Sequence, residues 1–314
     1  MNRKILAGML VLIFVTLACG SGVSTQQVDN VSTIVAATIQ ALTAAPPAAG
    51  PLATQAAPTQ APPQTGATQA VATQPSGTPV TFKNVSFIIP NGLAGGAAAE
   101  QVAAVDDTSG APWDVAPAHI HFTLNGYNNS LGKFSVTEIS IYPAQGFASA
   151  NNSAGSSLSK LQAILASPSA PLTRDAMPYV PYFNAGQMVA AQMQRINFAS
   201  GSGVRLVTQY GQAVGPIANN GTFYHFQGLT TDGKYYIIAV LSVGSSILPS
   251  GNDPNAIEPV PAGGVPFPGY NGMDPAAYEA YYQSVADALN NNTNSFTPSL
   301  VQLDALIQSI QVSP

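Results

Sequence analysis

The sequence predicts an α+β fold in which helices pack on the faces of an antiparallel sheet, as an α/β/α sandwich. Two observations predict it. Alternating apolar segments flank tight-turn residues, as strands of hairpins do, and amphipathic segments with capping residues follow them near the end of the chain. The fold is expected to occupy residues 80–314, because residues 46–79 consist largely of Ala, Pro, Thr and Gln and lack large apolar side chains.

The first half of this domain is expected to contain three strands and a helix. Val80–Ile89, His119–Leu124 and Phe134–Tyr142 have the composition or alternation of strands. In Ser156–Ala166 the apolar residues recur at helical spacing instead. The order of these segments is typical of an α+β domain rather than of repeated βαβ units.

Two hairpins are expected next. Gln192–Phe198 pairs with Val204–Tyr210, and Thr222–Leu229 pairs with Lys234–Val243 around the turn signal Asp232-Gly233. The last of these strands is apolar on both faces, which predicts a central position with cover on both sides. The two sets of side chains are Tyr235, Ile237, Ala239 and Leu241 on one face and Tyr236, Ile238 and Val240 on the other.

Two closing helices are expected to supply the covering layers. Asp274-Pro275 and Thr297-Pro298 each place a capping residue before a proline, which is the usual chemistry of a helix N-terminus. Apolar residues follow each pair at helical spacing. The stretch before these helices, residues 244–273, is rich in Pro and Gly and is expected to form a long surface loop.

Residues 1–18 have the pattern of a signal peptide. Arg3 and Lys4 precede the apolar stretch Ile5–Leu17, which is shorter than the about 20 residues of a membrane-spanning helix. Thr16-Leu17-Ala18-Cys19 resembles the lipobox of bacterial lipoproteins, although Leu is usual where this chain has Thr16. The resemblance implies a diacylglyceryl lipid on Cys19 and a position at the outer face of the cell membrane.

Residues 19–79 are expected to form a tether between lipid and domain. Within residues 29–44, Val31, Ile34, Val35 and Ile39 recur at helical spacing, so this part is either a short helix or a fluctuating segment. Residues 46–79 carry loose Ala-Thr-Gln repeats and are expected to be a disordered linker. Its physical role is to hold the domain away from the membrane.

The charge balance argues against nucleic acid as a partner. Only 7% of residues are charged, and two of the nine basic residues lie in the leader, which leaves seven basic against fourteen acidic side chains. Nucleic-acid binding draws most of its affinity from Lys and Arg, and the chain has no basic cluster. The membrane partner is therefore expected to be reached through the lipid anchor rather than through anionic headgroups.

His119 and His121 are the most suggestive pair for a metal. They are two residues apart on an expected strand and so share one face, which is a spacing used by zinc sites. His225 is a candidate third nitrogen ligand, and Asp114 or Glu138 a candidate carboxylate. The competing interpretation is that these histidines are structural or face water, because Ile120 and its apolar neighbours take the opposite face of the strand.

Two further motifs have both a chemical and a structural interpretation. Ser157 and Lys160 match the Ser-x-x-Lys of penicillin-binding enzymes, but the chain has no Ser-Asp-Asn or Lys-Thr-Gly partner, which favours a solvated Lys160. Asp106, Asp107 and Asp114 form either a calcium-binding loop or a solvated acidic turn.

Several aromatic residues in Pro-rich loops are candidate ligand-binding residues. Such rings stack on sugars or peptides, although loop aromatics also plug the edges of cores. The candidates are Tyr179, Tyr182, Phe183, Phe267 and Tyr270.

The order of elements resembles the PsbP-type domains found in many exported bacterial proteins. The residues that carry the resemblance are Val85–Pro90, Tyr224–Ala239 and Leu303–Ile310, whereas the inserts at 91–117 and 244–273 depart from the family pattern. The resemblance implies a non-catalytic module for binding or assembly, with no catalytic residues to carry over. Residues 203–243 also resemble stretches of uncharacterised bacterial lipoproteins.

These patterns lead to one expected function and two alternatives. We expect a non-enzymatic, lipid-anchored lipoprotein that binds or assembles with another component of the cell envelope and needs no cofactor. One alternative is a module that binds a glycan or small ligand through its loop aromatics. The other is a metal-dependent enzyme that uses His119 and His121.

Overall fold

The computed structural model describes residues 76–128, 137–179, 185–253, 258–270 and 274–314, which fold as an α+β domain with antiparallel sheets. Its helices are α3 (Ala144–Ala150), α4 (Asn152–Ala166), α5 (Pro275–Asn291) and α6 (Leu300–Gln308). Its strands are β1 (Gly77–Phe82), β2 (Val85–Pro90), β3 (Gly96–Val102), β4 (His119–Asn125), β5 (Glu138–Pro143), β6 (Gly186–Phe198), β7 (Gly201–Gly211), β8 (Thr222–Thr230), β9 (Tyr235–Ser242), β10 (Gly244–Ser245), β11 (Phe296–Thr297) and β12 (Gln311–Val312).

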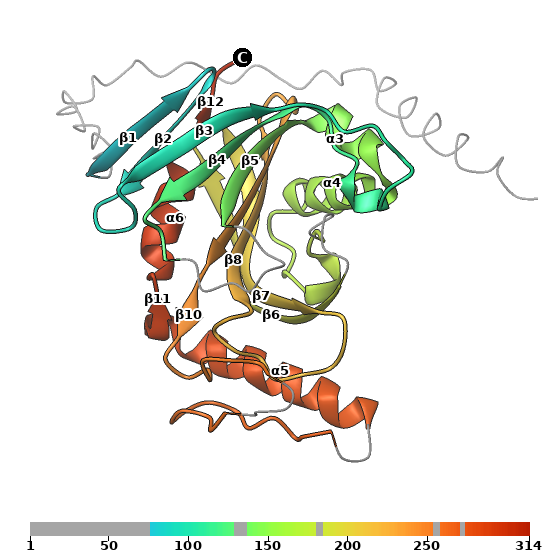
Figure 1. Cartoon of the computed structure of the whole chain (residues 1–314), viewed down its shortest axis with the longest axis vertical. Coiled ribbons are helices and arrows are strands. Elements are labelled where there is room, and N and C mark those ends of the chain that lie inside the picture. Colours follow the sequence, from blue (N-terminus) through green and yellow to red (C-terminus); the bar gives the residue numbers. More distant parts are fainter. Residues whose placement is uncertain (1–75, 129–136, 180–184, 254–257, 271–273) are drawn as a thin grey trace, which may run out of the picture. The chain divides into compact units, whose positions relative to one another are not determined.

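The larger sheet has seven strands in the order β3-β4-β5-β9-β8-β7-β6, and every neighbouring pair is antiparallel (Figure 1). The middle strand is β9, as its two apolar faces predict. Ile237, Ala239 and Leu241 enter one core, and Ile238 and Val240 enter a second core on the opposite face. The period of two along a strand thus divides the domain into two separate cores.

The layers that cover this sheet differ from the expected ones. The prediction that α5 and α6 cover opposite faces is wrong, because apolar side chains of both helices, such as Leu289 and Leu303, belong to the same core. The opposite face is covered by α3 and α4, through residues such as Phe147 and Leu161. The short chain between α5 and α6 contains β11, which pairs with β10 and keeps both helices on one side.

The single strand expected at Val80–Ile89 is in fact a hairpin. It turns at Lys83, whose backbone is left-handed with φ 53°, so that β1 and β2 pair with each other. The strand β12 pairs with the other edge of β2 and completes a three-stranded sheet. Phe87 and Phe82 of this sheet contact Phe122 of β4, with ring centroids 5.1 and 6.3 Å apart.

The helix ends confirm one predicted cap and correct another. Asp274 caps α5, since its side chain accepts a hydrogen bond from the backbone N–H of Ala276 at 2.9 Å. The helix α6 begins later than expected: Ser299 caps it by accepting from the N–H of Gln302 at 3.3 Å, while Thr297 lies in β11. Ser299, directly after Pro298, offers the same kind of capping oxygen as Thr297. The sequence pattern alone did not show which of the two residues caps the helix.

The edge strand β6 is longer than expected and contains a bulge. Its pairing with β7 shifts between Ala191 and Gln194, and Gln192 has a left-handed backbone with φ 54°. The backbone N–H of Gln192 donates to Asn290 Oδ1 of α5 at 2.6 Å, and its side-chain amide donates to Leu289 O at 2.8 Å. The bulge therefore ties α5 to the edge of the sheet.

Candidate functional site

Polar side chains gather on β3, β4 and β5, toward one edge of the larger sheet. His121 lies opposite Glu100 of β3 and opposite Ser140 of β5. Its Nδ1 is 3.6 Å from Glu138 Oε2 and 3.3 Å from Ser140 Oγ, and its Nε2 is 3.2 Å from Thr123 Oγ1. Three neighbouring strands thus bring two carboxylates and an imidazole into one cluster.

His119 lies beside this cluster but is held by the protein. Its Nδ1 is 2.9 Å from the carbonyl oxygen of Pro117, and its ring stacks on Tyr142 with centroids 4.3 Å apart. Burial raises the pKa of the Tyr142 hydroxyl, and the charge of Glu138 adds to that effect. His119 is therefore a buried residue whose ring packs against Tyr142.

Next to the cluster is a small cavity of about 120 Å³. Its walls are mostly aromatic or aliphatic, and Glu138 supplies a carboxylate. The lining residues are Trp113, Val115, Ala116, Glu138, Tyr142, Phe147, Ala150 and Asn151.

A backbone bridge closes the loop that carries Trp113. Val105 and Ala116 form an antiparallel bridge with two backbone hydrogen bonds of 2.9 and 3.0 Å. Between them, a single 3-10 turn over Pro112–Asp114 presents Trp113 to the cavity. The opposite wall consists of α3 and the first residues around α4, which follow β5 directly in the chain.

His119 and His121 are both neutral at neutral pH. Burial lowers the pKa of His119 and of His121, and it outweighs the opposing effects of the Pro117 carbonyl on the former and of the Glu100 charge on the latter.

The structure does not bring His225 to the other two histidines. It lies on β8, three strands from β4 in the sheet order, or roughly 14 Å at the usual strand spacing. It is fully buried, and its Nε2 is 2.9 Å from the amide nitrogen of Gln227. Among the described residues, no three His, Cys, Asp or Glu side chains are arranged to hold a metal ion.

The acidic loop is a turn in this structure. Asp107 Oδ1 accepts a hydrogen bond from the N–H of Ser109 at 2.8 Å, and hydrogen bonds from Ser109 lower the pKa of this carboxyl. Asp106 and Asp114 are exposed beside it. Calcium binding there remains a prediction.

The Ser-x-x-Lys residues hold a loop in place. Ser157 is buried and donates to the carbonyl oxygen of Tyr179 at 2.6 Å. Lys160 donates to Asp175 O at 2.7 Å and Met177 O at 3.4 Å, so it is bonded to backbone carbonyls rather than simply solvated as expected. Both side chains fasten residues 175–179 onto α4.

The described loop aromatics fall into two groups. Tyr179 packs edge-on against Tyr210 with centroids 4.9 Å apart. Phe267 contacts Tyr270 at 5.1 Å and Tyr281 of α5 at 5.2 Å, and it packs against the core. The rings of Tyr179, Phe267 and Tyr270 therefore pack at the edges of the cores. Tyr182 and Phe183 lie outside the described residues.

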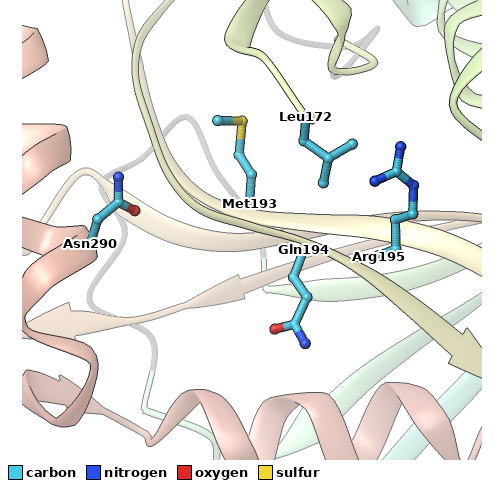
Figure 2. Close-up of a pocket in the computed structure, with 5 residues that line it drawn as sticks. All are labelled: Leu172, Met193, Gln194, Arg195 and Asn290. Atoms are coloured by element: carbon cyan, nitrogen blue, oxygen red, sulfur yellow. The ribbon is translucent and has the colours of Figure 1, made fainter. Parts of the chain in front are cut away.

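A wider hollow of about 470 Å³ lies at the β6 edge, lined by Leu172, Met193, Gln194, Arg195 and Asn290 (Figure 2). Met193 and Arg195 point to one side of the strand and Gln194 to the other. The guanidinium of Arg195 donates to the carbonyl oxygens of Ser167 and Ala170 at 3.0 and 2.8 Å. The polar side chains that line this hollow thus already form hydrogen bonds within the domain.

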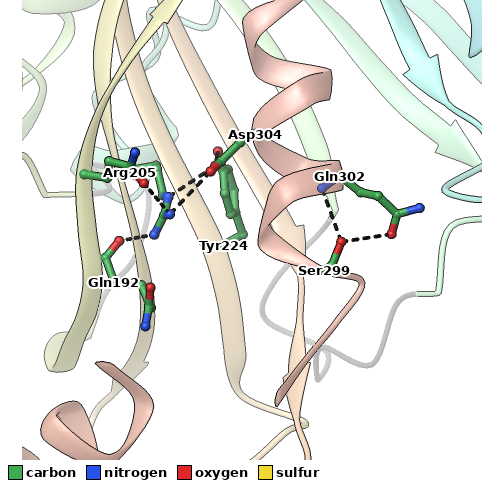
Figure 3. A network of polar contacts seen from close by, with 7 residues as sticks. Gln192, Arg205, Tyr224, Ser299, Gln302 and Asp304 are labelled. Atoms are coloured by element: carbon green, nitrogen blue, oxygen red, sulfur yellow. Dashed lines mark hydrogen bonds and ion pairs between the residues drawn. The ribbon is translucent and has the colours of Figure 1, made fainter. Parts of the chain in front are cut away.

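A buried ion pair lies next to that hollow (Figure 3). Arg205 of β7 donates through Nε to Asp304 Oδ1 at 3.2 Å and through Nη2 to Oδ2 at 3.3 Å. Tyr224 donates to the same carboxylate at 2.9 Å, and Gln194 and the Gln192 carbonyl accept from the guanidinium. This network fixes α6 on the sheet and is structural.

Sequence reasoning named Glu138 only as a metal ligand and missed the rings around it. Trp113, Tyr142 and Phe147 come from a loop, a strand and a helix that the sequence did not place together. The one available signal was the sole tryptophan of the chain, which lies between the expected strands Val80–Ile89 and His119–Leu124.

Comparison of the chain with protein-family models, curated proteins and solved structures found no match. Among the described residues, no helix is long and apolar enough to cross a membrane. The expected lipidation residue Cys19 and the tether up to residue 75 lie outside the described residues.

Proposed function

We propose that this chain is an exported lipoprotein, held at the outer face of the cell membrane by a lipid on Cys19, whose domain is a non-catalytic binding module of the envelope. The observation that carries the proposal is the lipobox-like Thr16–Cys19, which directly follows a charged and then apolar leader. Several acyl chains, at about 0.8 kcal/mol per buried methylene, anchor a protein firmly.

The stretch after the cysteine suits a tether. Residues 46–79 carry many prolines and no large aromatic side chains, so they have little to gain from packing. In an extended polyproline conformation such a segment reaches about 100 Å. The domain is thereby placed well clear of the bilayer, where a binding module meets solutes and other envelope components.

A binding role is favoured over catalysis by how the reactive side chains are used. Ser157 and Lys160 are bonded to backbone carbonyls, and His225 lies in the core. The cavity beside Glu138 offers mostly apolar walls to a small ligand. The resemblance to PsbP-type domains supports the same class of function.

The anchor is tested by labelling cells with radioactive palmitate. Wild-type chain and a matched Ser21→Ala variant are expected to take up label and to stay with the membrane fraction. The Cys19→Ser variant is expected to take up none, because the thiol is the only site for the lipid. Label in the Cys19→Ser variant, or an uncut and unlabelled wild-type chain in the cytosol, contradicts the proposal.

A further inference from the structure

We propose that the cavity beside Trp113 binds one neutral aromatic ring of a ligand. The inference rests on the proposed binding function and deepens it by naming the class of ligand. Three properties of the cavity carry it, namely its aromatic walls, the engagement of its lining carboxylate within the protein, and its size.

The walls suit an aromatic ring because they consist largely of such rings themselves. Trp113, Tyr142 and Phe147 line the cavity, and the rings of Tyr142 and Phe147 lie with centroids 5.0 Å apart and planes tilted by 42°. Aromatic rings in edge-on or offset contact attract each other beyond the effect of burying apolar area. A further ring in the cavity therefore contacts the wall rings in the way in which they already contact each other.

The walls are held in place by contacts outside the cavity. Phe147 of α3 stacks on the fully buried Tyr236 with centroids 4.6 Å apart. The loop that carries Trp113 lies directly against α3, because a Cβ added to Gly146 would be 3.1 Å from Pro117 Cβ. Walls that are already ordered lose little conformational freedom when a ligand binds, which favours binding.

The charges at the cavity favour a neutral ring. Glu138 supplies a carboxylate to the lining, and this carboxylate already has partners within the protein, including His121 Nδ1 at 3.6 Å. A cationic ligand would compete with these partners, and an anionic one would be repelled by the carboxylate. A sugar would lose hydrogen bonds to water that the mostly apolar walls do not replace.

The size of the cavity admits one ring. A dry cavity of roughly 150 Å³ takes a benzene molecule. The volume here is about 120 Å³, so a single ring enters with one edge toward solvent, and a bulkier apolar group does not fit. Substituents on the ring extend into solvent past the loop, since Trp113 and Ala116 are only partly buried.

The sole tryptophan of the chain lines this cavity, so its fluorescence reports directly on the site. The full-length Cys19→Ser chain is titrated with benzyl alcohol, with cyclohexylmethanol and with adamantylmethanol. Benzyl alcohol is expected to change the emission with saturation. Cyclohexylmethanol is expected to bind about threefold more weakly because it lacks a π-system, and adamantylmethanol about tenfold more weakly because it is too large. Binding of either analogue as tight as that of benzyl alcohol, or no saturable response to benzyl alcohol, overturns the proposal.

Two matched leucine variants locate the binding. Ala150→Leu fills the cavity from α3 and is expected to weaken the binding of benzyl alcohol about tenfold. Ser149→Leu adds the same side chain at the neighbouring exposed position, outside the lining, and is expected to leave the affinity unchanged. Circular dichroism and urea unfolding verify that both variants are folded. Unchanged binding in Ala150→Leu, or the same loss in Ser149→Leu, contradicts the proposal.

A second variant keeps the test decisive if Ala150→Leu does not fold. Saturation-transfer NMR on the ring protons of benzyl alcohol detects binding without the tryptophan reporter. The Cys19→Ser chain is expected to give the signal, and the same chain with Trp113→Ala to lose most of it, because one wall of the cavity is removed. An undiminished signal in the Trp113→Ala chain contradicts the proposal.

N-acetylphenylalaninamide distinguishes the two sources of such a ring. Tighter binding of this compound than of benzyl alcohol identifies an aromatic side chain of a peptide, and weaker binding identifies a small aromatic solute. Because these experiments use a chain without the lipid anchor, their failure leaves the palmitate result untouched. Failed acylation likewise leaves the benzyl alcohol titration valid.

Discussion

Two carboxylates packed against the seven-stranded sheet, Asp304 and Glu138, have different partners. Arg205 and Asp304 are buried, with side chains 6% and 16% exposed, and a tyrosine hydroxyl and further acceptors complete their hydrogen bonding. His121 and Glu138 are similarly shielded, at 16% each, but Glu138 borders a cavity with aromatic walls. The two carboxylates therefore have the same exposed fraction but different neighbours.

The difference lies in what surrounds each carboxylate. Asp304 is held by an always-charged guanidinium with matching fork geometry, so its charge is fully used within the fold. Glu138 faces an imidazole that is neutral at neutral pH and a space large enough for a small group. The first arrangement joins α6 to the sheet, and the second places a carboxylate at the wall of a small cavity.

The largest expected effect comes from breaking the buried pair. Arg205→Met leaves the Asp304 carboxylate without its cation, which typically costs about 3–5 kcal/mol of unfolding free energy. Urea denaturation measures the loss. Lys234→Met is the control, because Lys234 and Asp232 form an exposed pair whose removal costs about 0–1 kcal/mol. Equal small losses in both variants would show that the buried network is not structural.

The next effect is a loss of stability in acid caused by His225. Burial lowers its pKa to about 3, from an ordinary value of 6.5, so the unfolded chain binds the proton more readily than the folded one. The contribution of neutral His225 to the free energy of unfolding is complete above pH 6.5. It falls as the pH drops toward 3, by up to about 1.4 kcal/mol per pH unit.

Between pH 7 and pH 5 this loss amounts to about 2 kcal/mol, which urea midpoints at the two values resolve. His225→Leu is expected to flatten the pH dependence, because leucine does not titrate. His121→Gln, which alters a less buried histidine, is expected to leave most of the dependence in place. A His225→Leu chain as acid-sensitive as wild type would contradict the assignment.

A smaller loss of stability is expected when residues 175–179 lose one of their hydrogen bonds to α4. Ser157→Ala removes the bond to Tyr179 O, but Gln227 still donates to that oxygen at 3.0 Å. The expected loss is about 1 kcal/mol in thermal or urea unfolding. Ser159→Ala, two positions along the same helix and exposed, is expected to change stability by less than about 0.5 kcal/mol. Equal effects would contradict a role for the loop contact.

Most of the strand and helix types followed from local patterns. The double apolar alternation of Tyr235–Ser242 placed β9 in the middle of the sheet, and Asp274 capped α5 as its position before a proline predicted. The hairpin within the expected strand Val80–Ile89 was missed, because a two-residue turn at Lys83 carries no Gly or Pro.

The sequence by itself determined the element types and the central strand, because both depend on spacings within a few residues. It also contains the leader and the lone cysteine on which the proposed anchor rests. Only the tertiary structure decided that α5 and α6 share a face, since the apolar stripe of a helix shows which side is buried but not against which layer. It likewise separated His225 from His121 and brought Trp113 to Glu138, because strand order and loop closure are long-range properties that no local pattern encodes.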